Sequence, residues 1–70
     1  MMKGDRVALH PACDEWVQGD KYGVVVGWGR ARDYLDRFTR EVHSVRPVRV
    51  RLDRSGRVRR FHPDNVTVLE

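Results

Sequence analysis

Apolar and polar residues alternate strictly in the last third of the chain. The apolar positions are Val48, Val50 and Leu52, and the positions between them are Arg49 and Arg51. A period of two places these two sets on opposite faces of a β-strand. Asp-Arg-Ser-Gly at residues 53–56 is typical of a turn, and residues 57–61 can then run back along the first strand. The pattern predicts a hairpin with one apolar face and one face rich in guanidinium groups.

Short apolar runs bounded by turn residues predict five strands in all. They cover residues 5–9, 24–28, 48–53, 57–61 and 66–69. A polar loop over residues 10–22 separates the first two strands, and His-Pro-Asp-Asn at residues 62–65 suits a single turn of 3₁₀ helix. We therefore expect a mainly β protein.

Residues 33–43 break the strand pattern. Their apolar positions, which recur at helical spacing, are Tyr34, Leu35, Phe38 and Val42. Asp33 can cap a helix start, and opposite charges stand four residues apart along the segment. We expect a short amphipathic helix between the second and third strands; the alternative is that the flanking strands continue into a long protruding hairpin. A helix would lay its apolar stripe on an open end of the main fold or on a partner chain, which makes Tyr34, Leu35 and Phe38 candidate partner-binding residues.

The size of the chain limits what it can build. Its 70 residues form one domain, residues 1–70, and no more. A chain of this length buries only about 60% of the surface that its unfolded form exposes, so we do not expect a deep catalytic cleft within one copy. A single cysteine, Cys13, excludes an internal disulfide, and no apolar run approaches the roughly 20 residues that span a bilayer. We expect a cytoplasmic protein that does not enter a membrane.

The charge balance is basic, with a formal net charge of +4. Lysine occurs only at Lys3 and Lys21, so 12 of the 14 basic residues are arginine. Arginine offers a planar fork of donors that suits phosphate and carboxylate, whereas lysine offers a point charge. Binding of a polyanion would account for this bias, and so would the codon usage of a genome rich in G and C.

Two segments flank the first long loop: residues 3–7, Lys-Gly-Asp-Arg-Val, and residues 19–26, Gly-Asp-Lys-Tyr-Gly-Val-Val-Val. With the order of elements, they resemble the SH3-like small β-barrels that include the KOW and Tudor groups. The resemblance implies a five-stranded SH3-like barrel, to which residues 33–43 would add a helical insert, and a ribosomal or transcription-linked role in binding RNA or protein. The loop at residues 12–17 is longer and more acidic than the KOW pattern, and the insert is foreign to it.

The chain also resembles the type II dihydrofolate reductases, small SH3-like chains that form one active pore from four subunits. The resemblance is carried by residues 4–7, Trp16, residues 26–28 and residues 55–58. At the place of that family's pore-lining Val-Gln-Ile-Tyr, this chain has Val-Arg-Arg-Phe at residues 58–61. The amide and hydroxyl groups that hold pterin and cofactor are missing, so reductase activity is a remote alternative.

The predicted hairpin carries the candidate nucleic-acid site. On plain pairing of its strands, four arginines face the same side: Arg49, Arg51, Arg57 and Arg59. Like charges on one patch repel, and phosphate groups would relieve that repulsion. Val58 and Phe61 stand three residues apart, so burial of both requires a bulge near residues 59–60. A solvated face offset by nearby carboxylates is the alternative reading of the arginines.

Aromatic residues could add base stacking to such a site. Trp16 and Tyr22 lie in or beside the polar loop and are expected to be exposed, whereas Trp28 and Phe61 are expected in the core.

Neither a metal site nor a catalytic centre is predicted. His10 and Cys13 have ligand-like spacing, but a structural zinc site shows a second pair of ligands, and the remaining His43 and His62 stand far apart along the chain. His10-Pro11 and His62-Pro63 are read as turn residues after strands. No nucleophile, base and orienting group form a recognisable set, and we expect no cofactor.

The sequence thus predicts a non-enzymatic barrel that binds nucleic acid, RNA or DNA, through phosphate contacts. An acidic protein surface is an alternative ligand. A protein-interaction module or a homodimer that uses residues 33–43 is the alternative function.

Overall fold

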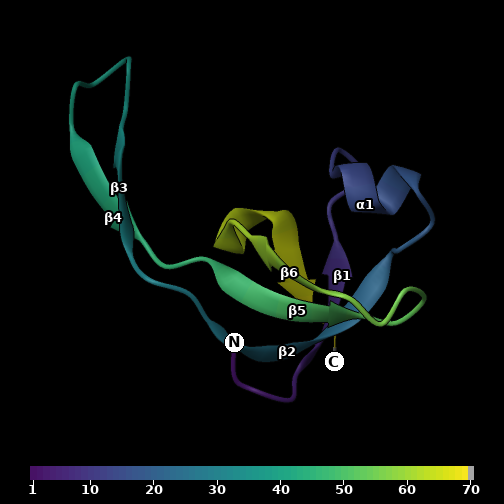
Figure 1. The fold of residues 1–70 in the computed structure, drawn as a ribbon. Helices are drawn as coiled ribbons and strands as arrows, with labels where there is room; N and C mark the ends of the chain where they lie inside the picture. Colours follow the sequence, from purple (N-terminus) through teal and green to yellow (C-terminus); the bar gives the residue numbers. More distant parts are fainter. Residues whose placement is uncertain (70) are drawn as a thin grey trace.

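A computed structural model describes residues 1–69 and shows a mainly β protein built from two antiparallel sheets (Figure 1). The larger sheet has five strands in the order β6-β5-β2-β1-β7. Their bounds are β1 Arg6–Leu9, β2 Tyr22–Trp28, β5 Val48–Leu52, β6 Val58–Phe61 and β7 Val66–Val68. The smaller sheet pairs β3 (Arg32–Leu35) with β4 (Val42–Val45). All five predicted strands are confirmed to within two residues at each end.

Two short helices complete the fold. The 3₁₀ helix η1 (Pro63–Asn65) lies where the His-Pro segment predicted a single turn. A one-turn helix, α1 (Asp14–Val17), lies inside the long loop and was not predicted. Its first turn closes on the Cys13 carbonyl, which accepts hydrogen bonds from the amides of Trp16 and Val17 at 3.1 and 3.3 Å.

The core lies on one face of the five-stranded sheet. Its buried apolar residues are Val7, Leu9, Val25, Val48, Val50, Leu52, Phe61 and Val66. All five strands of the larger sheet contribute to this set, and Figure 1 shows β1 running across the direction of β5, as expected of a strongly twisted sheet. The alternation in β5 is therefore the burial pattern of the strand: its apolar positions are buried and its arginines are exposed.

Strands β2 and β5 approach each other closely at Gly23. A Cβ atom added there would lie 2.4 Å from Cγ1 of Val50 and 2.6 Å from the carbonyl oxygen of Arg51. Only a residue without a side chain fits this position. A few residues later the register of the pair shifts between Val25 and Gly27, which marks a bulge in β2.

The bulge predicted near residues 59–60 is wrong. Strand β6 pairs with β5 in regular register, with Val50 opposite Arg59 and Arg49 opposite Arg60. Phe61 is buried, whereas Val58 lies on the opposite face and is 40% exposed. No bulge is needed because β6 is the outermost strand, where Arg59 can share the side of Phe61 and remain exposed.

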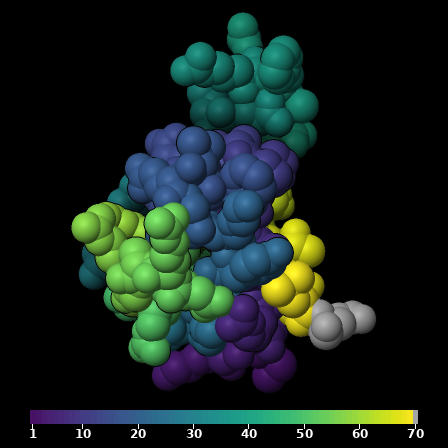
Figure 2. All heavy atoms as spheres, turned by 90° about the vertical axis from the view of Figure 1, so that its right-hand side faces the viewer, coloured from purple at the N-terminus to yellow at the C-terminus, as the bar shows by residue number. Residues whose placement is uncertain are grey.

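The helical insert predicted for residues 33–43 is also wrong. The chain forms the β3–β4 hairpin instead, with Tyr34 opposite His43 and Leu35 opposite Val42. Figures 1 and 2 show this hairpin, coloured teal, projecting away from the rest of the molecule. It prolongs the β2–β5 pair, as in the alternative reading of the sequence.

The turn at the tip of the hairpin explains why a strand pair forms here. The Asp36 carboxylate accepts hydrogen bonds from the amides of Phe38 and Thr39 at 2.9 and 3.3 Å. Arg40 adopts a left-handed conformation with φ of 59°, and its amide donates to the Asp36 carbonyl at 2.7 Å. A side chain that satisfies nearby backbone amides in this way competes with helix formation. The ion pairs that favoured the helix contribute only about 0.2–0.5 kcal/mol each.

These hydrogen bonds also lower the pKa of Asp36 below its ordinary value of 3.8, chiefly through the Phe38 amide and then through the Thr39 amide. Because the folded hairpin favours the charged carboxylate, its contribution to stability is present above pH 3.8 and is lost as the pH falls through the lower folded pKa.

We predict that Asp36→Ala disorders the tip of the hairpin while Asp33→Ala, which removes a carboxylate from the same hairpin without losing a turn hydrogen bond, leaves it intact. In amide-resolved NMR, Asp36→Ala should shift the Phe38 and Thr39 amides and speed their hydrogen exchange. Wild type should show the same change on acidification from about pH 5 to about pH 2.5. Equal effects of the two substitutions would contradict the assigned role of Asp36.

Candidate nucleic-acid interface

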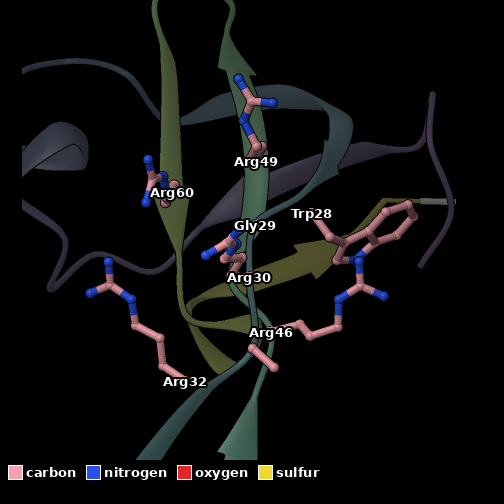
Figure 3. A pocket seen from close by; sticks show the side chains of 8 residues that line it. Trp28, Gly29, Arg30, Arg32, Arg46, Arg49 and Arg60 are labelled. Atoms are coloured by element: carbon pink, nitrogen blue, oxygen red, sulfur yellow. The ribbon is translucent and has the colours of Figure 1, made fainter.

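A wide groove opens where the five-stranded sheet passes into the β3–β4 hairpin (Figure 3). Its volume is about 930 Å³. The residues that line it, which we name the arginine groove, are Trp28, Gly29, Arg30, Ala31, Arg32, Arg46, Arg49 and Arg60. Four strands and two short connections supply these residues, so the groove exists only in the folded chain.

Backbone pairing brings the two connections together. The Gly29 amide donates to the Pro47 carbonyl at 2.9 Å, which continues the β2–β5 ladder toward the hairpin. A Cβ atom at Gly29 would lie 2.8 Å from Cγ of Pro47. Glycine therefore lets the two connections run close together, and their arginines border one hollow.

The lining of the arginine groove is strongly positive. Five of its eight residues are arginines and none is acidic. Within residues 1–69, the one arginine that forms an ion pair is Arg6, whose Nη2 lies 2.7 Å from Oδ2 of Asp53. The five guanidinium groups of the groove therefore keep their donors available to an anion from outside.

The four arginines predicted to share a face do not do so. Arg49 and Arg51 lie on the exposed face of β5, and Arg49 enters the arginine groove. Arg59 stands opposite Val50 and Arg57 follows the same register opposite Leu52, so both lie on the other side of the ribbon. The expectation required Val58 on the core side of β6, whereas the observed register places Phe61 and Arg59 on that side.

Arg57 and Arg59 instead border a second hollow with mixed charge. Its lining is Asp14, Glu15, Gln18, Asp20, Leu52, Arg54, Ser55, Arg57 and Arg59. In Figure 2 the green end of the β5–β6 hairpin lies beside the blue loop that carries α1. Three carboxylates share this hollow with three arginines, so its charge is largely balanced. This side of the ribbon matches the solvated alternative that the sequence left open.

The acidic loop is held against the ribbon by direct contacts. Asp20 is 7% exposed, and its Oδ1 accepts a hydrogen bond from the Ser55 amide at 3.1 Å. Arg54 donates to the Gln18 carbonyl at 3.1 Å. The two contacts keep carboxylates beside Arg57 and Arg59.

The aromatic residues are distributed differently from the prediction. Trp16 packs against the core, and Nζ of Lys21 lies 4.8 Å from its ring centroid. Tyr22 is exposed, as expected, at the start of β2 and outside the arginine groove. Phe61 is buried as predicted, but Trp28 was wrongly expected in the core: it is 37% exposed and lines the groove.

Sequence reasoning missed most of the groove: Arg30, Arg32, Arg46, Arg60 and Trp28. A signal was present, since arginines gather at both ends of the segment that was read as an insert. A helix would keep the two ends of this segment apart, whereas the β3–β4 hairpin brings them side by side.

The candidate partner-binding residues lie on the β3–β4 hairpin. Leu35 and Phe38 are exposed, and the Tyr34 ring meets His62 edge to face at a centroid distance of 6.0 Å. Tyr34 is therefore partly engaged within the molecule, whereas Leu35 and Phe38 are available to a partner.

Two histidines have structural positions in turns, as predicted. Nδ1 of His10 accepts a hydrogen bond from the Ala12 amide at 3.0 Å, and Nδ1 of His62 accepts one from the Asp64 amide at 3.1 Å. Burial and the nearby Glu15 carboxylate raise the pKa of the Cys13 thiol. Over residues 1–69, no three His, Cys, Asp or Glu side chains gather closely enough to hold a metal ion.

Comparison of the chain with models of protein families, with curated proteins and with solved structures found no match. Among the described residues, no helix has the length and apolar character needed to cross a bilayer.

The charge distribution predicts opposite effects of two arginine substitutions on stability. Arg60→Gln removes a charge directly opposite Arg49 and should raise the free energy of unfolding at low salt by about 0.2–1 kcal/mol. Arg6→Gln removes the ion pair with Asp53 and should lower the free energy of unfolding by at most about 1 kcal/mol. Urea unfolding at about 20 mM and about 500 mM salt measures both, and screening should remove the gain from Arg60→Gln. A gain from Arg60→Gln that persists at high salt would show that repulsion is not its cause.

Proposed function

We propose that this protein is a non-enzymatic SH3-like barrel that binds nucleic acid through the arginine groove. The observation that carries the proposal is a groove lined by five arginines and no carboxylate. The strongly twisted five-stranded sheet, with its core on one face, supports the barrel assignment.

The number of guanidinium groups favours a ligand with several phosphates. One phosphate group carries a charge of at most about −2, so it neutralises only part of the groove. A chain of phosphates can engage several arginines in turn, because each guanidinium presents a planar fork of donors to two phosphate oxygens. Release of counterions from the polyanion then drives binding and makes it depend on salt.

Contacts of this kind recognise the phosphate backbone and carry no base information. Binding through the groove arginines is therefore expected to depend little on sequence. An acidic protein surface would meet the same charge, but carboxylates along a folded surface do not follow a regular chain as phosphates do.

We predict that charge reversal in the groove weakens binding while charge reversal on the other side of the same ribbon does not. The variants are the pairs Arg49→Glu with Arg60→Glu, and Arg57→Glu with Arg59→Glu as a control of equal charge change. Fluorescence anisotropy with a labelled oligonucleotide, from about 50 mM to about 200 mM salt, measures affinity and its salt slope. The groove pair should lose about tenfold or more in affinity and reduce the slope by about one per lost phosphate contact.

Circular dichroism should show that both variants fold. Equal losses from the two pairs would indicate a general charge effect and contradict the groove. If a poly-glutamate peptide of the same charge bound as tightly as the oligonucleotide, the ligand class would be an acidic protein instead.

A second candidate function, self-assembly, rests on the exposed apolar residues of the β3–β4 hairpin. Phe38 is fully exposed at its tip, and Leu35 faces Val42 across the pair with both side chains exposed. A two-stranded ribbon by itself is marginally stable in water, and its free edges can pair with another strand. An identical hairpin from a second copy would supply both an edge and an apolar surface.

For this candidate we predict a concentration-dependent dimer that Leu35→Ser and Phe38→Ser abolish together. Sedimentation velocity measures the mass, and Tyr22→Ser is the control because Tyr22 is an exposed aromatic residue on the other sheet. A wild-type protein that stays monomeric at about 1 mM would exclude self-assembly of this kind.

A further inference from the structure

Trp28 has an unusual position for the largest type of side chain in so small a protein. It ends β2 and lies opposite Val48, a core residue, yet it is 37% exposed and borders the arginine groove. Figure 3 shows its indole projecting from the wall of the groove, away from Arg32 and Arg60. Trp28 thus adds an aromatic side chain to the border of the positive groove.

Space remains open at the residue before Trp28. Gly27 precedes Trp28 and stands opposite Arg49, and a Cβ atom added at Gly27 would meet nothing within 4 Å. The end of β2 is therefore uncrowded on the side that faces Arg49.

Within residues 1–69, no cation of the protein stacks on the Trp28 ring. In the part of the chain that the structure describes, the one cation that stacks on an aromatic ring is Lys21, over Trp16. Of the two tryptophans, Trp16 is thus engaged by its own chain, whereas Trp28 keeps a face for a ligand.

We propose that the arginine groove takes single-stranded nucleic acid, with one base stacked on the Trp28 indole and the flanking phosphates on Arg46 and Arg49. This inference rests on the proposed function and deepens it. A duplex keeps its bases stacked inside and offers no free base face, whereas an unpaired base stacks on an aromatic side chain whatever its identity. The arginines supply charge, and Trp28 supplies the preference for an unpaired strand.

The test compares three probes that all carry phosphates and differ in whether they offer a free base for stacking. They are an oligothymidylate of about 12 nucleotides, an abasic oligomer of the same length and charge, and a duplex of the same length. Wild type should bind the oligothymidylate about five- to hundredfold more tightly than the abasic oligomer, which is the range that one stacked base supplies. Trp28→Ala should bind the two single strands equally, with an unchanged salt slope, and Trp28→Phe should keep part of the preference.

Tryptophan fluorescence gives an independent reading. The oligothymidylate should quench the emission of wild type, the abasic oligomer should not, and the quenching should disappear in Trp28→Phe, which retains Trp16. Persistence of the quenching in Trp28→Phe would contradict stacking on Trp28.

The other outcomes separate this inference from the proposed function. If wild type binds both single strands equally and the groove reversal still weakens both, phosphate binding stands and stacking is wrong. If Trp28→Ala weakens binding of the oligothymidylate and of the abasic oligomer equally, Trp28 only shapes the groove, and the inference is overturned. If no probe depends on the groove arginines, the proposed function itself fails.

Discussion

The pairing of β5 with β6 is the constraint on which the surface chemistry of this protein depends. Burial of alternate residues in β5 decides that its arginines face outward, because Val48, Val50 and Leu52 occupy the core. The regular register then assigns each residue of β6 to one side. A shift of one residue would exchange Arg59 with Arg60 and bring a different set of charges to each face.

This register separates the positive charge into two environments. On one side, the ribbon faces the loop that carries α1, where carboxylates balance the arginines. On the other side, arginines of the ribbon meet those of the connections to the β3–β4 hairpin, and no acidic residue lines the groove that results. A net charge of +4 is therefore compatible with one strongly positive hollow, because none of the described acidic residues lines it.

The β3–β4 hairpin shows how local hydrogen bonding can outweigh side-chain periodicity. Apolar residues at helical spacing favour a helix only when a surface is available to cover them, and here Leu35 and Phe38 remain exposed. The Asp36 carboxylate and the left-handed Arg40 close a turn within a few residues. Since β2 and β5 already pair antiparallel, continuing the ladder into a hairpin requires no change of direction.

The sequence by itself determined the class of the fold, the five main strands, the 3₁₀ turn and most buried positions, because a period of two and turn residues act within a strand and its ends. It did not determine which arginines share a face, since register is a relation between strands, nor that Trp28 borders a groove. Arg30, Arg46 and Arg60 are far apart along the chain and meet only where the hairpin leaves the sheet. Only the tertiary structure decided that meeting, because pairing across the sheet and the close contact of Gly29 with Pro47 bring these segments together.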